Sequence, residues 1–279
     1  MAESLKMALF GLHWYRDTDP ATIARQAQRA EDVGFEALWV GDHIALPAQG
    51  DDEPRLEALI ALTYLAAVTR QIRLGFGVIV LPQRQPVLLA KQLTSIDILS
   101  HGRLSVGIGV GHVAEEMQAL GVSFAERGGR TDEYLAAMRT LWHESTSEFA
   151  GQFVTFDGVV EHPRPIQRPN PPIIIGGHAP SSYRRAIQSG NGWYGWELDL
   201  DETAQALAQL REAAARYQGP SELGALEISI TPRGMIDVDT ARRYADLGVR
   251  RLVFLPAAMT AGAIDETITQ VAETLIGHL

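Results

Sequence analysis

The chain of 279 residues contains no cysteine. Disulfide bridges, thiolate metal sites, iron–sulfur clusters and cysteine nucleophiles are therefore excluded. Basic residues are in the minority, with 24 Lys and Arg against 34 Asp and Glu, so the formal net charge is −10. Because binding to phosphate backbones depends on clustered Lys and Arg, no nucleic-acid partner is expected.

Long apolar runs are also missing. The longest stretch without a formal charge, residues 169–183, is short and interrupted by Pro and Gly, so no segment is expected to span a membrane. A single Lys precedes the brief apolar run at 7–12, which is too little for a signal peptide. These absences predict a soluble, cytoplasmic protein.

What the sequence does contain is an alternation of short apolar strands with longer helical patterns. Several strands, such as FGVIV at 76–80, are apolar throughout, which is typical of parallel strands covered on both faces. The predicted strands are 6–11, 37–40, 72–80, 104–108, 172–175, 192–195, 226–230 and 251–254. The predicted helices are 20–33, 55–69, 87–99, 131–142, 181–189, 201–217, 239–247 and 263–275.

Eight such units predict one α/β domain over residues 1–279, a (β/α)8 TIM barrel. The alternative is a doubly wound open sheet, which needs fewer strands for a similar length. Residues 112–171 hold a helix, a hairpin around Gly151 and a Pro-rich segment, and are predicted to be an insertion after strand four. Because insertions after barrel strands lie on the catalytic face, this one and the loop 43–54 are expected to wall a substrate pocket.

The residues just past the strand ends form the active-site face of a barrel. His13, His43, His112 and His178 all fall at such positions. One such His usually packs or caps a turn, but four on one rim indicate a site. An apolar, partly aromatic substrate pocket is predicted from Trp14, Tyr15, Trp193, Tyr194 and Trp196.

A metal site is one alternative for this rim. The chain has neither His-x-His after the first strand nor His-Glu-x-x-His. His112, Glu115 and Glu116 have a helical spacing that could ligate a cation, but acidic residues are also favoured at a helix N-terminus by its dipole. No metal is therefore expected.

Two glycine-rich turns are candidate anion sites. The first is Gly-Ile-Gly-Val-Gly at 107–111, which differs from the dinucleotide pattern Gly-x-Gly-x-x-Gly, and the second begins at Gly176-Gly177. Each leaves a strand and enters a helix whose free N–H groups could hold an anion. Glycines also permit tight turns for purely structural reasons, but two such turns on neighbouring strands favour a phosphorylated ligand.

These residues give the chain a resemblance to the luciferase-like monooxygenase superfamily, and within it to the coenzyme F420-dependent oxidoreductases. The resemblance runs in order from Lys6 to about Trp196, and beyond that only the barrel pattern continues. The segments that carry it are AEDVGFEALWVGDH (30–43), GRLSVGIGVG (102–111), EEMQALGV (115–122), FAERG (124–128), QRP (167–169), IGG (175–177) and GNGW (190–193).

The resemblance implies a barrel that holds a flavin or deazaflavin at the C-terminal ends of its strands. The ring would lie near Asp42, His43, Gly77 and Val78, where the Gly77–Val78 peptide would be cis. The phosphate would meet the two glycine turns. The implied cofactor contacts there are Val110, Gly111, His112, Glu115, Gly176, Gly177 and His178.

The cofactor decides the reaction class. A deazaflavin transfers hydride and reacts poorly with oxygen, whereas reduced FMN activates oxygen, and in both cases the protein supplies orientation and electrostatics. The pair Asp42-His43 is similar to the F420 branch, while flavin-dependent relatives often carry Glu-His. We therefore expect an F420-dependent oxidoreductase that transfers hydride between the deazaflavin and a small organic substrate. The alternatives are an FMN-dependent monooxygenase and a non-catalytic cofactor-binding barrel.

His43 and His112 are the candidate catalytic residues. His43 would act as an acid or base beside the reactive carbon, since His titrates near neutral pH; its other possible role is to orient Asp42 or cap the loop. His112 stands where relatives often carry Trp and some carry Glu, at a proton-donating or ring-stacking position.

A homodimer is also expected. The helix at 56–68 is apolar nearly all round, whereas an outer barrel helix needs only one inward stripe. Its second face, together with residues 87–99, is therefore predicted to meet another subunit, as the resemblance also implies.

Overall fold

The computed structural model describes residues 5–48 and 53–279, and its central feature is a closed parallel barrel. The strand order is β3-β2-β1-β11-β10-β9-β8-β5-β4, and pairing of β3 with β5 closes the sheet. The strands are β1 Lys6–Phe10, β2 Ala37–Val40, β3 Arg73–Phe76, β4 Ile79–Val80, β5 Leu104–Gly109, β8 Ile173–Gly176, β9 Gly192–Gly195, β10 Glu227–Ile230 and β11 Arg251–Phe254. Because β3 and β4 are two parts of one barrel strand, the (β/α)8 prediction is confirmed.

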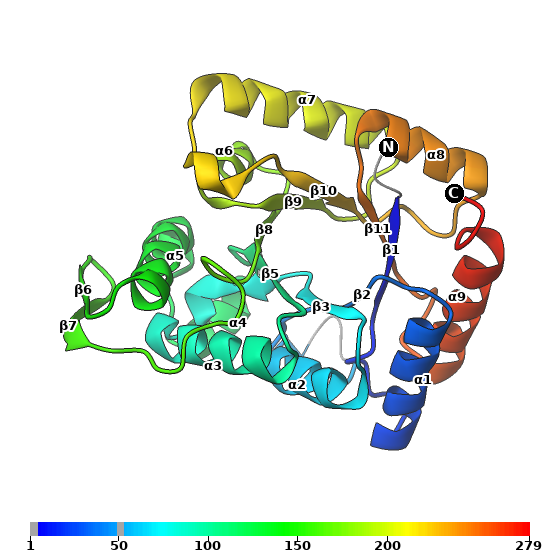
Figure 1. Cartoon of the computed structure of the whole chain (residues 1–279), viewed down its shortest axis with the longest axis horizontal. Helices are drawn as coiled ribbons and strands as arrows, with labels where there is room; N and C mark the ends of the chain where they lie inside the picture. Colours follow the sequence, from blue (N-terminus) through cyan, green and yellow to red (C-terminus); the bar gives the residue numbers. More distant parts are fainter. Residues whose placement is uncertain (1–4, 49–52) are drawn as a thin grey trace.

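Helices surround this barrel (Figure 1). They are α1 Pro20–Asp32, α2 Ala58–Val68, α3 Pro86–Leu99, α5 Arg127–His143, α6 Pro180–Ser189, α7 Leu200–Arg216, α8 Val238–Leu247 and α9 Ala261–Thr274. Short helical turns are η1 Leu81–Gln83, α4 Ala114–Ala119, η2 Phe124–Glu126 and η3 Ser221–Leu223. In the described part of the chain, no helix combines the length and apolar character that crossing a bilayer requires.

Strand side chains alternate between two buried clusters, as successive residues of a strand point to opposite sides. The larger cluster packs strands against helices and includes Leu9, Leu38 and Leu74. The smaller includes Phe10, Trp39 and Tyr194, which follow the opposite alternation and so fill the barrel interior. The strand ends above this interior cluster form the floor of the site.

Strand three is interrupted where the resemblance places the cofactor ring. The Gly77–Val78 peptide is cis, which confirms that prediction. Glycine is needed at Gly77 because a Cβ there would lie 2.9 Å from Cε3 of Trp39 and 3.2 Å from Cε1 of Tyr194. The interruption therefore lies directly over the aromatic side chains of Trp39 and Tyr194 in the barrel interior.

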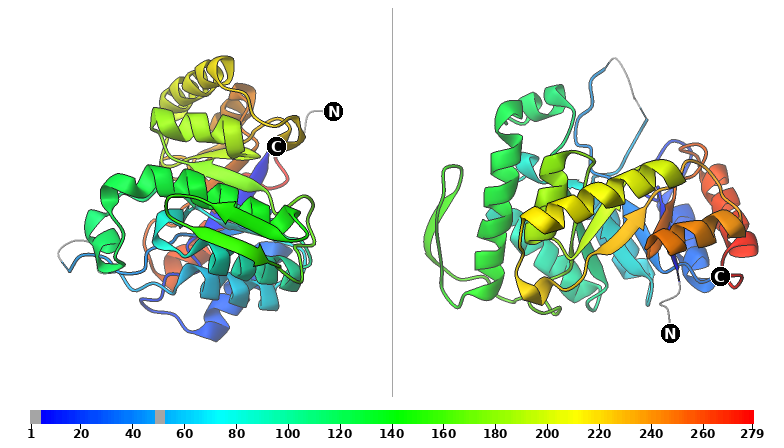
Figure 2. Two further views of the ribbon diagram at one scale, coloured as in Figure 1. Left: turned by 90° about the vertical axis from the view of Figure 1, so that its left-hand side faces the viewer. Right: turned by 90° about the horizontal axis from the view of Figure 1, so that it is seen from above.

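The chain between β5 and β8 contains α4, α5 and a hairpin formed by β6 (Ser147–Ala150) and β7 (Thr155–Val159). The hairpin lies on the outer side of α5, remote from the strand ends (Figure 1; Figure 2, right). Its tip is held by Glu133 of α5, which accepts hydrogen bonds from the amides of Gln152, Phe153 and Val154. The predicted insertion is present, but α5 and not the barrel rim supports its hairpin.

Candidate functional site

The C-terminal strand ends enclose a cavity of about 690 Å³. The sequence-predicted site residues that line it come from four different strand ends. They are Asp42, His43, Gly77, Val78, Val110, Gly111, His112, Gly176, Gly177 and His178. The barrel thus brings together residues that lie far apart along the chain.

Glu115 does not join this group. Its side chain is exposed and does not line the cavity, whereas that of the adjacent Glu116 is only 2% exposed. Consecutive residues of a helix lie about 100° apart around its axis, so only one of the two can face inward. The inward carboxylate of this turn belongs to Glu116, so the structure does not bring Glu115 together with the other predicted cofactor contacts.

Glu116 forms a dyad with His43. Nδ1 of His43 lies 3.2 Å from Oε2 of Glu116, and the amides of Ile44 and Ala45 donate to Oε1 at 2.5 and 3.2 Å. Burial raises the pKa of Glu116, but hydrogen bonds from His43 and from the Ile44 amide bring it down to about 2. The carboxylate therefore stays ionised at neutral pH and fixes Nδ1 of His43 as the protonated ring nitrogen.

Asp42 has a structural task beside this dyad. It is buried and accepts hydrogen bonds from the amide of Val80 at 3.0 Å and from Nε and Nη2 of Arg84 at 3.0 and 2.5 Å. Arg84 also donates to Glu57 at 2.6 Å. Burial lowers the pKa of Arg84, yet hydrogen bonds to these two carboxylates raise it overall, so the guanidinium remains charged. Asp42 thereby ties the β2 turn to the β4 end.

The glycines of β5 and β8 make room for Val78. A Cβ on Gly109 or Gly176 would lie 2.5 or 2.7 Å from a methyl carbon of Val78, and one on Gly107 would overlap the carbonyl oxygen of Phe76. In the predicted 107–111 anion turn, Gly107 and Gly109 therefore have a packing function. Of these glycines, Gly111 has the left-handed φ of 78° typical of such turns.

A second turn leads from β8 into α6. Gly177 has a φ of 118°, and a Cβ on it would lie 2.7 Å from Oγ of Ser182, which also lines the cavity. Helix α6 has Ala179 at its N-cap and no side-chain capping hydrogen bond. Its N-terminal N–H groups and Ser182 hydroxyl can therefore accommodate an anion.

His178 and His112 differ in their surroundings. Nε2 of His178 accepts the amide hydrogen of Trp196 at 3.0 Å, and burial lowers the pKa of its imidazole. His178 thus helps to hold the loop after β9. His112 is exposed at the cavity mouth, and its ring lies edge-on to that of His43 at 5.8 Å between centroids.

The remaining wall is partly aromatic. Phe10, Trp14, Tyr194 and Trp196 line it, while Trp193 lies behind and donates from its indole to the carbonyl of Gly177 at 2.9 Å. Arg55 and the loop 255–259, which follows β11, also line the cavity but were not predicted from the sequence. The rule that active-site residues follow barrel strands could have identified that loop.

The predicted walls are only partly present. Among the described residues, His112 is the one member of 112–171 that lines the cavity, because α5 carries the chain away from the rim before the hairpin begins. His43 and Arg55 line it on the side of the loop 43–54. Residues 49–52 of that predicted wall lie outside the described residues.

His13 is the buried histidine of the site. It is 1% exposed, and burial, with smaller contributions from Arg55 and His43, lowers its pKa from 6.5 to about 3. Between these pH values His13 is protonated in the unfolded chain and neutral in the folded protein. The stability that the neutral ring contributes is therefore fully present above pH 6.5 and is lost as the pH falls towards 3.

We expect protonation of this histidine in the unfolded chain to lower the free energy of unfolding by about 1.4 kcal/mol for each pH unit below about 6. Urea unfolding at about pH 7 and pH 5 measures it. His13→Gln should reduce the loss over this range, whereas His278→Gln, at an exposed position, should leave it unchanged. Equal losses in the wild type and His13→Gln would contradict the assignment.

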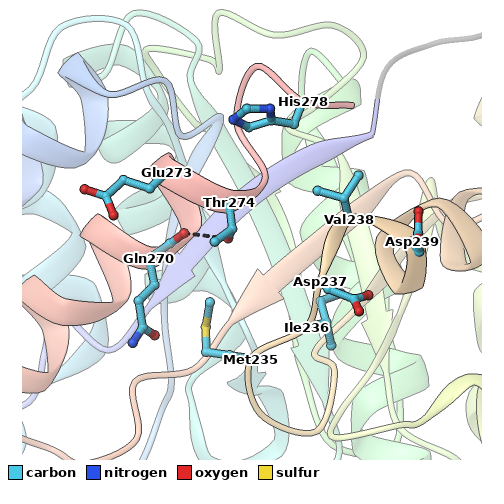
Figure 3. A pocket seen from close by; sticks show the side chains of 9 residues that line it. All are labelled: Met235, Ile236, Asp237, Val238, Asp239, Gln270, Glu273, Thr274 and His278. Carbon is cyan, nitrogen blue, oxygen red and sulfur yellow. Dashed lines mark hydrogen bonds between the residues drawn. The ribbon is translucent and has the colours of Figure 1, made fainter.

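A second hollow of about 760 Å³ lies between the start of α8 and the end of α9 (Figure 3). Its side chains include Met235, Asp237, Gln270, Glu273 and His278. None of the sequence-predicted site residues lines it. Within residues 5–48 and 53–279 there is also no group of three or more His, Asp or Glu side chains arranged to hold a metal ion.

A family model described as luciferase-like monooxygenase matches residues 7–266. The chain belongs to this family. Its members are oxidoreductases and monooxygenases that use F420 or a flavin. An uncharacterized protein of Mycobacterium tuberculosis is 31% identical over 263 residues, which is 88% of this chain and 90% of the relative.

Two relatives with stated activities use different cofactors. The oxygenase component of a flavin-dependent trigonelline monooxygenase from Acinetobacter baylyi is 30% identical over 77% of this chain and 61% of its own length. An F420-dependent glucose-6-phosphate dehydrogenase from Kineococcus radiotolerans is 29% identical over 72% of this chain and 61% of its own length. Sequence similarity therefore supports both cofactor classes.

Solved structures confirm the fold. The monooxygenase RslO1 from Streptomyces bottropensis superposes with a TM-score of 0.79 at 22% identity, covering 98% of this chain and 99% of its own. An F420-dependent secondary alcohol dehydrogenase, in complex with an F420-acetone adduct, also has a TM-score of 0.79, at 17% identity and with 98% of both chains covered. At these identities the likeness concerns the barrel alone.

Proposed function

We propose that this protein is an F420-dependent oxidoreductase that transfers hydride between the deazaflavin and a small organic substrate. The observation that carries the proposal is the Asp42-His43 pair on the cavity wall, with His43 hydrogen-bonded to the ionised Glu116. This pair is similar to that of the F420 branch. When bound, F420 supplies a carbon centre that accepts or donates hydride.

The residues present fit a phosphorylated ring cofactor. Gly109, Gly111, Gly176 and Gly177 line the cavity with backbone at two strand ends, and Val78 lines it from the interrupted strand. The uncapped start of α6 would hold the phosphate. The aromatic wall beyond them would leave an apolar compartment for the substrate.

His43 would move the proton that accompanies hydride transfer. Glu116 engages Nδ1, so Nε2 is the ring nitrogen left to exchange a proton with a substrate oxygen. If the substrate is an alcohol, Nε2 accepts the hydroxyl proton as the hydride leaves carbon; in the reverse direction His43 returns it to a carbonyl oxygen. Glu116 stabilises the imidazolium that this transfer creates.

The alternative is an FMN-dependent monooxygenase, which the similarity to the trigonelline enzyme favours. Reduced FMN activates oxygen, whereas F420 transfers hydride and reacts poorly with oxygen. Cofactor binding and the oxygen dependence of turnover therefore discriminate between the two functions. A non-catalytic cofactor-binding barrel is the third candidate, and it would bind F420 without oxidising or reducing any substrate.

We expect F420 to bind more tightly than FMN. Fluorescence titration of both cofactors measures this, and a panel of small alcohols and ketones, monitored through F420 absorbance, measures hydride transfer. Ser182→Asp should weaken binding of either cofactor at least about tenfold, because a carboxylate would repel the phosphate. Tighter FMN binding, or oxygen-dependent turnover with reduced FMN, would overturn the F420 proposal. F420 binding without turnover of any tested substrate would support the silent barrel.

We also propose a homodimer through α2 and α3. Ile60 of α2 and Leu88 and Leu99 of α3 are 68%, 58% and 61% exposed, and such apolar surface is typical of an interface. Sedimentation at micromolar concentration should show a dimer that Ile60→Asp together with Leu88→Asp converts to a monomer. Met235→Asp, on the separate α8–α9 hollow, serves as the control. A wild-type monomer would contradict this proposal.

A further inference from the structure

The turn that carries His43 is held by hydrogen bonds to groups outside it. Val80 and Arg84 fix Asp42, and Glu116 fixes the amides of Ile44 and Ala45. The turn begins at Gly41, whose N–H donates to Nε2 of His13 at 3.3 Å. Hydrogen bonds therefore hold the turn on both sides of His43, and His13 accepts the one on the β2 side.

This hydrogen bond determines the state of the His13 ring. A backbone N–H can only donate, so Nε2 must present a lone pair and the neutral ring carries its proton on Nδ1. Nδ1 is buried and has no partner within the described chain. The ring packs edge-on against Phe10, with centroids 5.3 Å apart, and lies 5.9 Å from the indole of Trp14. A protonated His13 ring would therefore find neither solvent nor a counter-ion at Nδ1.

We propose that His13 is a positioning residue, a permanently neutral hydrogen-bond acceptor that holds the Gly41 end of the turn and thereby places His43. The role of His43 in proton transfer rests on the proposed function, but the positioning does not. Little space is available for the turn to adjust, since a Cβ on Gly41 would lie 3.0 Å from the Phe10 ring and 3.5 Å from Nε2 of His13. Loss of the acceptor would leave the Gly41 N–H unsatisfied, and the turn would shift to regain a partner.

Two variants separate the acceptor from the bulk of the ring. In His13→Gln the side-chain amide oxygen occupies the region of Nε2 and can accept the Gly41 N–H, whereas His13→Leu fills space without an acceptor. In the cofactor-free protein, NMR-detected exchange of the Gly41 amide should accelerate at least about tenfold in His13→Leu and stay within about threefold of wild type in His13→Gln.

The wild-type protein provides a test that needs no variant. Nitrogen-15 shifts of the histidine rings should identify His13 as the neutral Nδ1–H tautomer at neutral pH, and His43 should show a proton on Nδ1. The same His43 signal should move in His13→Leu and return in His13→Gln. A charged His13 or an Nε2–H tautomer in the wild type would overturn the positioning role, even if both variants fail to fold.

Turnover gives the functional readout. In F420-coupled assays, His13→Leu should lower kcat about tenfold or more, with a smaller change in KM, since sub-ångström misplacement affects the reacting groups more than binding. His13→Gln should restore most of it. Equal amide exchange and equal kcat in the two variants would contradict the proposal. Absence of F420 turnover in the wild type would instead count against the proposed function, and the amide and tautomer measurements would still decide the positioning role.

Discussion

Gly107→Ala is expected to destabilise the folded protein by about 3 kcal/mol or more. The new Cβ would overlap the carbonyl oxygen of Phe76 and lie 3.3 Å from Cγ1 of Val78. The obstacle is backbone of the neighbouring barrel strand, so no side-chain rotation can relieve it, and β3 and β5 must separate. The midpoint and slope of urea unfolding measure the loss.

The matched control is Gly262→Ala in α9, where a Cβ would meet no atom within 4 Å. This change should stabilise the protein slightly, by about 0.5–1 kcal/mol, because alanine is favoured over glycine in helices. An unfolding free energy for Gly107→Ala within about 1 kcal/mol of wild type would show that the strands can separate easily. The close approach would then not be a constraint on the fold.

Replacing His43 with Gln is expected to lower kcat/KM by about 10²–10⁴-fold, which is the usual contribution of a positioned acid or base. The amide can keep a hydrogen bond to Glu116 but cannot exchange a proton with the substrate. Cofactor affinity should change far less than turnover. Single-turnover reduction or oxidation of F420, with the best substrate of the panel, measures the chemical step separately from product release.

Two carboxylates serve as partner and control for this experiment. Glu116→Gln should also slow turnover, because it removes the charge that stabilises a protonated His43, while Glu115→Gln should have no effect since that side chain is exposed. Full activity of His43→Gln would mean that another group, such as His112, transfers the proton. A loss in Glu115→Gln equal to that in Glu116→Gln would reject the orientation of α4.

Local patterns in the chain were sufficient to predict the barrel. Apolar strands and helical patterns depend on residues close together in the sequence. The strands Ala37–Val40, Gly192–Gly195 and Arg251–Phe254 were for this reason predicted with their observed limits. The strand-end rule then led to Asp42, His43 and the glycine turns. In a parallel barrel all strand ends share one face, so a one-dimensional pattern locates the site.

The contacts that make the site work were decided by tertiary structure. Glu116 meets His43 across 73 positions of the chain, and His13 meets Gly41 across 28. No local period records such pairings, and the choice of Glu116 over Glu115 depends on how α4 is rotated against the rim. The strand-end pattern indicated most of the loops that reach the active-site face, although it missed the loop 255–259. Only the packing of helices and turns around the barrel decided which of them touch, because hydrogen bonds act over about 3 Å while sequence patterns specify an element and not its rotation.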